Sequence, residues 1–504
     1  MEPTVLAFLV AAIGAACWIA WPADKGRFAL MRARRGSLNP VSSAVAQGYR
    51  QITKVSGKPF FVRYWQRDYM VLPSKYLPDV RRAGRDHLAF FETISDVMFL
   101  YNWVGDLFNS SRMTFSIIKG VNPQLPKLSH GMFQESLLAF EEELRLDHGE
   151  STMINALDVI TAVSLRTMTR IIAGKDLSSN KAFLEATAAY FNGNFLTGFI
   201  MLRMPLRGAI RDLLAWPLYK YHQHFRQQRL IEMIKPVIAK RMEYHQSGNN
   251  ANNRGDLDTI QCTLNLLDSF PLDVNAKDSP LHTLAHETLQ LIWAAGQSPA
   301  ISTTAVLFKM LEEPSYIAPL REEARAAVEK YGWEDPILNE LPKLDSFIRE
   351  THRLYPVFTL NATRLVKGKP FTFSDGFTVP PGTRIAFPAE ECQKDSDFIS
   401  NPQEFDGFRF IKLAATDARQ EDGVSRWAAS HASFSNLTFG YGNHACPGRF
   451  IAIRLLKVLL TRLLLEYEFS WDVIGEPPPR FVLEGISFPN VGQRITVRRP
   501  TKSS

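Results

Sequence analysis

The pattern of hydrophobic and polar positions divides the chain into segments of different character. Residues 4–21 form an uncharged apolar run, and short alternating apolar segments lie within residues 59–77. Alternation with a period of two predicts strands, so we expect a small sheet there, and an Asp-Gly turn predicts a hairpin over residues 371–377. Beyond the first sheet the apolar residues recur mostly at helical spacing. The pattern therefore predicts a mainly α-helical domain with small β-sheets.

Three later segments show helical spacing most clearly. Residues 282–310 have the length and apolar content of a helix that crosses a core. A second helix carries apolar residues of the segment 344–354 on one face and ends at Tyr355-Pro356. A third is predicted from about Phe450 to Leu465, because Pro447 is favoured at the first position of a helix.

The apolar run at residues 4–21 is just long enough to span a bilayer. Positive charges follow it within residues 25–35, whereas the acid Glu2 precedes it, so the positive-inside rule places the rest of the chain in the cytoplasm. We favour an uncleaved signal anchor over a cleaved signal peptide, which would carry its charges in front of the run. The predicted organisation is a membrane anchor at residues 1–22, a basic hinge at 23–41 and one catalytic domain at 42–504.

The composition narrows the class of protein further. A content of 45% hydrophobic and 11% aromatic residues is enough for a large core. The four cysteines have no paired spacing, so neither a disulfide framework nor a zinc site is expected. The net charge of +7 is spread thinly apart from an arginine-rich patch near residue 30, and no nucleic-acid-binding module is recognisable. We therefore expect no nucleic-acid partner.

One loop near the C-terminus has the character of a ligand-binding site. Residues 439–449 read Phe-Gly-Tyr-Gly-Asn-His-Ala-Cys-Pro-Gly-Arg, with one cysteine just before a predicted helix. The positive end of the helix dipole and unpaired N–H groups lower the pKa of a thiol there, which makes Cys446 a metal ligand. Gly440, Gly442 and Gly448 let the backbone approach a flat group closely. A glycine-rich turn with an ordinary buried cysteine is the alternative.

This loop resembles the haem-binding loop of the cytochrome P450 family of haem-thiolate monooxygenases. The resemblance implies the cytochrome P450 fold, a single large helical domain around haem b. It also implies that Cys446 is the axial iron ligand, that Phe439 packs against it, and that His444 reaches a haem propionate. Arg364 falls where the family usually has another propionate partner. Lys119 matches a basic partner only loosely, and a surface lysine is an equal alternative.

The motif at residues 350–353 matches the family's Glu-x-x-Arg, but chance pairs such as 142–145 and 322–325 match it too. The apolar face of the surrounding helix selects Glu350 and Arg353, because a buried unpaired charge costs several kcal/mol. By the resemblance, Arg409 is a second arginine that completes a buried charge triad. We expect this triad to have a structural role, holding the cysteine loop under the haem.

The predicted helix at 282–310 departs from the family's pattern of small pair, spacer, acid and threonine. If residues 294–295 are the small pair, Gln297 replaces the acid and Ser298 the threonine. If residues 295–296 are the small pair, Ser298 replaces the acid and Pro299 the threonine. We prefer the first register, since it keeps a hydroxyl that can order water, while Gln297 cannot donate a titrating proton. Pro299 should kink or open the helix.

Three other segments bear on the substrate. Residues 357–362 lie where the family has a substrate-contacting strand, and the apolar tip at residues 485–489 is expected to line the pocket. Residues 190–216 are unusually apolar at helical spacing, which is typical of core packing. In the family this position forms a lid over the substrate that touches the membrane. Residues 248–256, with several asparagines, are predicted to be a loop.

The resemblance implies a membrane-anchored monooxygenase of the endoplasmic reticulum, single-pass, with its catalytic domain in the cytoplasm, and we expect a monomer. Its electrons would come from NADPH through cytochrome P450 reductase, with cytochrome b5 as a further donor and a basic face for docking. The substrate would be a lipophilic secondary metabolite, terpenoid or polyketide-derived, as for fungal microsomal members. Two alternatives remain open: an isomerase or dehydratase that needs no reductase, suggested by Gln297, and a non-catalytic haem-binding protein.

Overall fold

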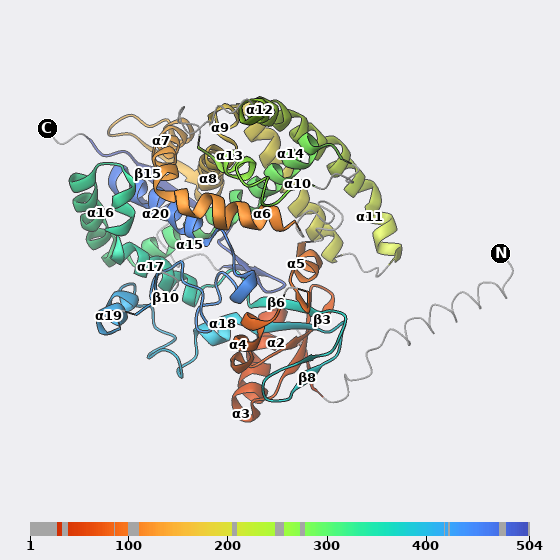
Figure 1. Cartoon of the computed structure of the whole chain (residues 1–504). Helices are drawn as coiled ribbons and strands as arrows, with labels where there is room; N and C mark the ends of the chain where they lie inside the picture. The colour runs from red at the N-terminus through yellow and green to blue at the C-terminus, as the bar shows by residue number, and fades with distance from the viewer. Residues whose placement is uncertain are drawn as a thin grey trace.

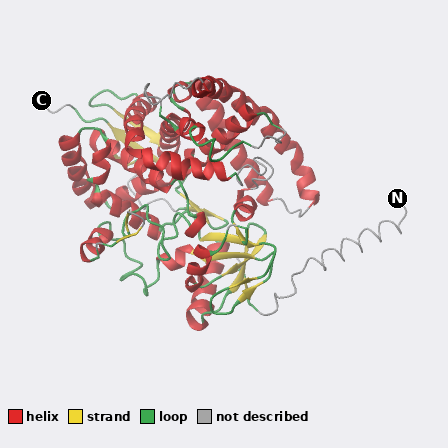
Figure 2. Cartoon of the chain, in the orientation of Figure 1, coloured by secondary structure: helices red, strands yellow, loops and turns green. Residues whose placement is uncertain are grey.

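A computed structural model describes residues 28–32, 39–84, 86–98, 110–203, 209–246, 257–272, 278–417, 419–421, 424–472 and 480–501. Figure 1 shows a large helical part and, nearer the N-terminus, a smaller part built around a sheet. The strands gather mainly in this smaller part, as the yellow segments of Figure 2 show. The predicted mainly α-helical fold with small sheets is confirmed.

The largest sheet has six strands in the order β1-β2-β3-β9-β6-β4. These are β1 Leu30–Met31, β2 Phe60–Tyr64, β3 Arg67–Val71, β9 Arg384–Pro388, β6 Leu360–Val366 and β4 Leu88–Ala89. The strands predicted within residues 59–77 form the antiparallel hairpin β2-β3, whose two turn residues, Trp65 and Gln66, both have positive φ. Because β1 pairs with β2, the folded part begins before residue 42, inside the predicted hinge.

Four smaller sheets complete the β structure of the described residues. One has three strands, β12 Glu468–Trp471, β15 Arg494–Arg498 and β5 Ser151–Asn155. The other three are the pairs β7 Phe371–Thr372 with β8 Thr378–Val379, β13 Phe481–Leu483 with β14 Ile486–Phe488, and β10 Gln420–Glu421 with β11 Val424–Ser425. The pair β7-β8 is the hairpin predicted from the Asp-Gly turn, and Gly376 there has the positive φ that the turn requires.

The helical part is built mainly from longer helices. The longer ones are α7 Leu125–Leu144, α8 Ala156–Ala173, α10 Lys181–Arg203, α11 Ala209–Tyr221, α12 Gln228–Gln246, α14 Pro280–Gly296, α15 Ser298–Glu312, α16 Ile317–Tyr331, α17 Pro342–Leu354 and α20 Arg449–Glu466. Shorter ones are α2 Pro40–Gly48, α3 Lys54–Ser56, α4 Leu77–Arg82, α5 Phe91–Met98, α6 Ser111–Phe115, α9 Lys175–Ser178, α13 Thr259–Leu264, α18 Ala389–Gln393 and α19 Arg409–Thr416. Irregular turns of helix are η2 Tyr49–Thr53, η3 Ser74–Tyr76, η6 Ser116–Val121, η7 Asn122–Gln124, η8 His222–Gln227, η10 Pro314–Tyr316, η11 Asp335–Asn339 and η12 Gly442–His444.

The main core lies where α8, α15 and α20 pack together. Helix α20 is buried on most of its surface, and Leu455 and Leu459 have no exposed area. They belong to the same cluster as Val306 and Met310 of α15. Fully burying one such side chain contributes about 1.5–3 kcal/mol, so α20 and α15 form a stable support for the loop that precedes α20.

The long helix predicted at residues 282–310 consists of two helices, α14 and α15, which meet at Gln297. Pro299 lies in the first turn of α15, where a missing backbone N–H is tolerated. The predicted interruption is therefore present, two residues before the proline. The third predicted helix, α20, begins at Arg449 with Gly448 as its N-cap. The prediction that Pro447 occupies its first position was wrong by two residues.

Two predicted segments, the anchor at residues 1–22 and the asparagine-rich loop at 248–256, lie outside the described residues. Within the part of the chain that the structure describes, none of the helices combines the length and the apolar character needed to cross a membrane. Cys262, Cys392 and Cys446 are free.

Candidate active site

The cysteine loop is held in a tight turn directly before α20. The backbone N–H of Cys446 donates to the carbonyl of Phe439 at 2.8 Å, which closes the loop on itself. Gly440 and Gly442 both have positive φ, +72° and +70°, where any other side chain would be strained. A Cβ on Gly442 would also lie 2.7 Å from the Cα of Arg81. The two glycines are therefore required by the turn itself.

Cys446 lies in the loop directly before α20, and the pKa of its thiol is raised, contrary to the lowering expected from the helix. The Cys446 side chain is accessible to water, yet protein atoms surround it so closely that burial raises the pKa of its thiol. The backbone N–H groups of Gly448 and Arg449, together with the Arg449 guanidinium, act in the opposite direction and stabilise a thiolate. A soft thiolate held by backbone N–H groups directly before a helix is a suitable donor for haem iron.

Arg364 connects β6 to the cysteine loop. It is almost fully buried, and its guanidinium donates to the carbonyls of Thr363 at 2.7 Å and Tyr441 at 2.9 Å. The guanidinium lies 5.7 Å from the ring of Phe90, and the ring of His444 lies 5.6 Å from the same ring. Arg364 and His444 therefore converge beside Phe90, where two cationic or hydrogen-bonding groups fit the anionic propionates of a haem.

Lys119 is placed differently. Its side chain is exposed, and its ammonium lies 5.1 Å and 5.2 Å from the centres of the rings of Phe115 and Phe270, which stack on each other. This arrangement matches the surface-lysine alternative. The residue of this region that contacts the cysteine loop is Asn122, which donates to the carbonyl of Pro447 at 3.2 Å. No feature of the sequence pattern distinguished Asn122.

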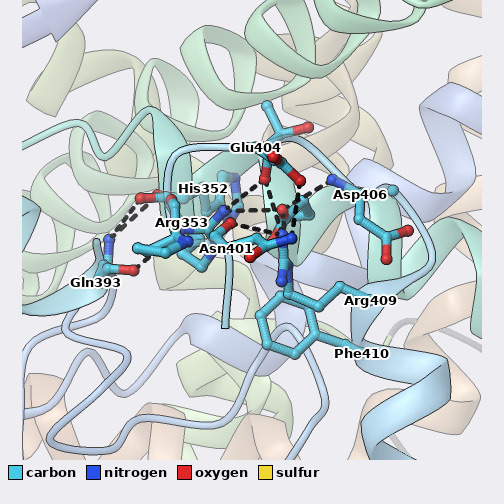
Figure 3. Close-up of polar contacts among 12 residues, drawn as sticks. His352, Arg353, Gln393, Asn401, Glu404, Asp406, Arg409 and Phe410 are labelled. Atoms are coloured by element: carbon cyan, nitrogen blue, oxygen red, sulfur yellow. Dashed lines mark hydrogen bonds and ion pairs between the residues drawn. The ribbon is translucent and has the colours of Figure 1, made fainter. Parts of the chain in front are cut away.

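Glu350, Arg353 and Arg409 form one buried ion-pair cluster, and Figure 3 labels its two arginines. The Arg353 Nε lies 2.7 Å from Glu350 Oε2, and the Arg409 Nε lies 3.0 Å from Glu350 Oε1. The three side chains are 0%, 4% and 9% exposed, in the order Glu350, Arg353, Arg409. Glu350 Oε1 also accepts the backbone N–H of Asp406 at 3.0 Å, so its charge is well compensated.

The two arginines use their other N–H groups to hold the segment at residues 400–404. Arg353 donates to the carbonyls of Pro402 at 2.6 Å and Glu404 at 3.2 Å. Arg409 donates to the carbonyls of Ser400 at 2.6 Å, Asn401 at 3.2 Å and Glu404 at 2.8 Å. These bonds offset the cost of burying two guanidinium groups. The cluster therefore ties α17, α19 and the segment between α18 and α19 together.

Gln393 links this cluster to the cysteine loop. Its Nε2 donates to the carbonyls of His352 at 3.3 Å and Arg353 at 3.4 Å, as Figure 3 shows. Its Oε1 accepts the N–H of Leu437 at 3.1 Å and the hydroxyl of Thr438 at 3.2 Å. The sequence did not predict this role of Gln393, because a buried, bridging glutamine cannot be told from a solvent-exposed one by residue type alone.

His352, between the two charged members of the motif, joins α17 to α15. Its Nε2 is hydrogen-bonded to the hydroxyl of Ser302, and its ring meets the ring of Phe439 edge-on at 6.4 Å. Burial lowers the pKa of His352 to about 4, so the ring is neutral at pH 7. The contact connects the cysteine loop with the helix that carries Ser298, and sequence reasoning missed it.

Ser298 lies on an accessible face of the α14–α15 pair. The Ser298 hydroxyl donates to the carbonyl of Ala294 at 3.1 Å, and both residues are exposed. Gly296 and Pro299 are buried, and Gln297 is half-buried. This burial pattern favours the first register, because it directs a hydroxyl, and not the proline ring, to the accessible face.

Apolar side chains bring the two predicted lining segments together with α14. Phe358 pairs with Ile486 in an antiparallel bridge, so the two predicted lining segments, 357–362 and 485–489, lie side by side. Trp293 is only half-buried and packs against the same cluster of buried residues as Ile486. These contacts form an apolar surface that joins α14 to the two lining segments.

Residues 116–497 match the family model for cytochrome P450. The chain belongs to the cytochrome P450 family. Members of this family are haem enzymes in which a cysteine thiolate binds the iron. The protein is accordingly a cytochrome P450 monooxygenase, an oxidoreductase, and the non-catalytic alternative is set aside. The Cys446 thiol, together with Arg364 and His444, fits a bound haem.

Curated relatives match nearly the whole of this cytochrome P450. It is 36% identical over 459 residues to the cytochrome P450 monooxygenase sirB of Leptosphaeria maculans, covering 90% of this chain and 85% of that protein. It is 28% identical over 463 residues to the ent-kaurene oxidase P450-4 of Gibberella fujikuroi, covering 91% and 87%. A similar match, 30% over 464 residues, covers 90% of this chain and 86% of the cytochrome P450 monooxygenase paxP of Penicillium paxilli.

Among solved structures, the retinoic acid bound cyanobacterial CYP120A1 has a TM-score of 0.62 to this cytochrome P450 at 17% identity, covering 90% of this chain and 94% of that one. At 17% sequence identity this structural similarity establishes the fold alone. The predicted cytochrome P450 fold is therefore confirmed.

Proposed function

We propose that this cytochrome P450 oxidises a lipophilic terpenoid or polyketide-derived secondary metabolite, with Cys446 as the thiolate ligand of haem b. The observation that carries the proposal is the solvent-accessible Cys446 directly before α20, whose thiolate the backbone N–H groups of Gly448 and Arg449 stabilise. The apolar surface formed by Trp293, Phe358 and Ile486 supports a lipophilic substrate. A relative named for oxidising ent-kaurene, a hydrocarbon, supports the terpenoid class.

The residues around the cysteine would hold the cofactor in place. Arg364 and His444 would bind its propionates, and Phe439 would pack beside the thiolate. The cluster of Glu350, Arg353 and Arg409 acts at a distance, because it holds the segment that Gln393 joins to the loop. Bound haem supplies the activation of dioxygen. The protein orients the substrate and keeps water away from it.

Ser298 would position a water molecule on the accessible face of α15. Its hydroxyl is anchored by the Ala294 carbonyl, so its oxygen remains free to accept a hydrogen bond from water. The adjacent Gln297 orients that water through its amide but holds no titrating proton. Protons for the reaction would therefore pass through ordered water.

We propose that the protein is anchored in the endoplasmic reticulum membrane by residues 1–22 and acts as a monomer. Apolar side chains exposed on α11 and η8 support contact with a membrane, and they are Leu213, Leu214, Trp216, Leu218 and Phe225. The wild type should stay in the membrane pellet after a wash with alkaline carbonate, which removes surface-bound proteins, whereas deletion of residues 2–22 should release the protein, and an equally resistant deletion variant would contradict the anchor.

The activity is tested by comparing metabolites of producing cells with and without the gene, then assaying the accumulated precursor. Full-length protein, NADPH-cytochrome P450 reductase and NADPH should convert the precursor, and addition of cytochrome b5 should raise the rate. Conversion that needs neither NADPH nor dioxygen would instead support the isomerase or dehydratase, the candidate favoured by the missing acid at Gln297.

A further inference from the structure

A small polar cluster lies inside the apolar core where α10, η8 and α14 meet. Tyr190 of α10 is buried, and its hydroxyl accepts a hydrogen bond from Gln227 Nε2 at 2.9 Å. Burial raises the pKa of Tyr190, whereas the amides of Asn194, Gln227 and Gln290 beside its hydroxyl act in the opposite direction. Three amides and one phenol thus share one site in a region of aliphatic and aromatic residues.

Two atoms of this cluster have no hydrogen-bond partner among the residues that the structure describes. They are Nε2 of Gln290, a donor, and Oδ1 of Asn194, an acceptor. Gln290 is 1% exposed, so bulk water does not satisfy its amide. Buried polar groups in proteins nearly always have partners, so this pair of atoms points to a partner that the described residues do not supply.

The position of Gln290 connects the cluster to the accessible face of α14 and α15. Gln290, Ala294 and Ser298 are four residues apart in succession, which places them along one side of the helical pair. Ala294 and Ser298 are exposed, whereas Gln290 is covered. Helix α12 packs against both α14 and α10 in this region, near the top of Figure 1. The cluster therefore closes one end of the face that carries Ser298.

Two residues of α10 on either side of Asn194 contact the end of α14 and the lining segment at residues 485–489. Phe191 packs so tightly on Gly296 that a Cβ there would lie 2.9 Å from its ring. The ring of Phe195 meets that of Phe488, in the lining segment at residues 485–489, at 5.4 Å. Asn194 thus lies between the end of α14 and the apolar lining of the proposed pocket.

We infer that Asn194 and Gln290 form a polar subsite that binds an oxygen substituent of the substrate at a point remote from the reacting carbon. A substrate hydroxyl would donate to Asn194 Oδ1 and accept from Gln290 Nε2, which satisfies both atoms. The substrate is then an oxygenated lipophile, so an earlier reaction that introduces oxygen into the carbon skeleton must supply it. This inference rests on the proposed lipophilic pocket.

The wild-type protein should bind an alcohol much more tightly than the hydrocarbon with the same skeleton. A site built to hydrogen-bond a hydroxyl rejects an analogue that lacks it, because the protein's own polar atoms then stay buried and unpaired. An apolar replacement of the same size at residue 290 removes that penalty. The variant should therefore lose affinity for the alcohol and keep or gain affinity for the hydrocarbon.

The test titrates the haem-loaded full-length protein with pairs of probes that share a skeleton, recording the shift of the Soret band. The pairs are farnesene with farnesol, ent-kaurene with ent-kaurenol, and cholestane with cholestanol. For at least one pair the wild type should bind the alcohol roughly tenfold tighter than the hydrocarbon or better. Gln290→Leu should abolish that preference.

Gln261→Leu is the matched control, because Gln261 is also a buried glutamine but its Nε2 donates to Asn265 at 2.9 Å. It should keep the preference for the alcohol.

Asn194→Leu, at a half-buried position, provides the same test if Gln290→Leu does not fold. An unchanged preference in the variants, or an equal loss of both probes, would overturn the subsite. If the wild type binds the hydrocarbons well but does not prefer the alcohols, the subsite is overturned and the proposed function stands. If none of the probes shifts the Soret band, both the subsite and the proposed function are contradicted.

Discussion

At the scale of single residues, burial separates pairs that look identical in sequence. Glu322 and Arg325 have the same spacing as Glu350 and Arg353, and they also form an ion pair, at 3.0 Å. Their side chains are 70% and 52% exposed, so solvent screens the pair. The buried pair has Arg409 and several carbonyl groups as partners, and it connects three segments of the chain.

Replacing Arg353 by Leu should lower the free energy of unfolding by about 3 kcal/mol, because Glu350 then loses half of its charge compensation in a buried site. The haem content of the purified protein should fall with it. Arg325→Leu is the matched control and should change the free energy by less than about 1 kcal/mol. Urea unfolding of both variants measures the difference, and equal effects would contradict the structural role of the buried cluster.

Ser298→Ala removes the hydroxyl that would hold water on the accessible face of α15. More of the electrons taken from NADPH should then be released as hydrogen peroxide, because protons reach the reaction less reliably. Ser298→Thr keeps the hydroxyl and should behave like the wild type. Peroxide formed per NADPH consumed is the measurement, and unchanged coupling in the alanine variant would place the proton path elsewhere.

At the scale of elements, the junction between α14 and α15 determines which side chains of this helical pair are accessible. The helices meet at Gln297, and Pro299 restarts the backbone in the first turn of α15. Proline within a helix removes one hydrogen bond and collides with the preceding turn, so an interruption before it is expected. The interruption leaves Ser298 at an accessible helix end.

Pro299→Ala should allow α14 and α15 to join, because residue 299 regains its backbone N–H. Hydrogen exchange of the amides at residues 296–301 should slow as a result. The free energy of unfolding should change by less than about 1 kcal/mol, since the new hydrogen bond offsets the greater freedom of the unfolded chain. Pro342→Ala, at the start of α17, is the control and should leave this exchange unchanged. Unaltered exchange in Pro299→Ala would show that the proline does not cause the interruption.

At the scale of the whole molecule, hydrophobic periodicity was enough to predict the helical class, the small sheet that contains β2 and β3, and α17. The order of motifs along the chain predicted that Glu350, Arg353 and Arg409 meet, because the resemblance supplied the third partner. Gln393, Asn122 and the contact of His352 with Ser302 could not be predicted, since each depends on which distant segments pack together. Such contacts leave no periodic signal in the sequence.

The free energy of unfolding should depend on pH in the acidic range, because folding lowers the pKa of His286 and makes its protonation less favourable. Burial, with help from His282, lowers the pKa of His286 to about 4, below its usual value near 6.5. Between pH 6.5 and 4 the unfolded chain therefore binds protons that the folded chain does not, and the free energy of unfolding falls as the pH falls.

His286→Gln should make this fall smaller by on the order of 2 kcal/mol between pH 7 and pH 4. Urea unfolding at a series of pH values measures the slope. His148→Gln, at an exposed ring, is the control for the loss of an imidazole. A slope in the His286 variant equal to that of the wild type would contradict the assigned cause.

The central claim is that the Cys446 thiolate binds the haem iron, and the reduced carbon monoxide difference spectrum tests it most directly. Wild type and the control Cys262→Ala, which alters a different free and buried cysteine, should both show the Soret band diagnostic of the family. Cys446→Ser, purified in folded form, should lose that band. A Cys446→Ser protein that keeps the diagnostic band would contradict the account.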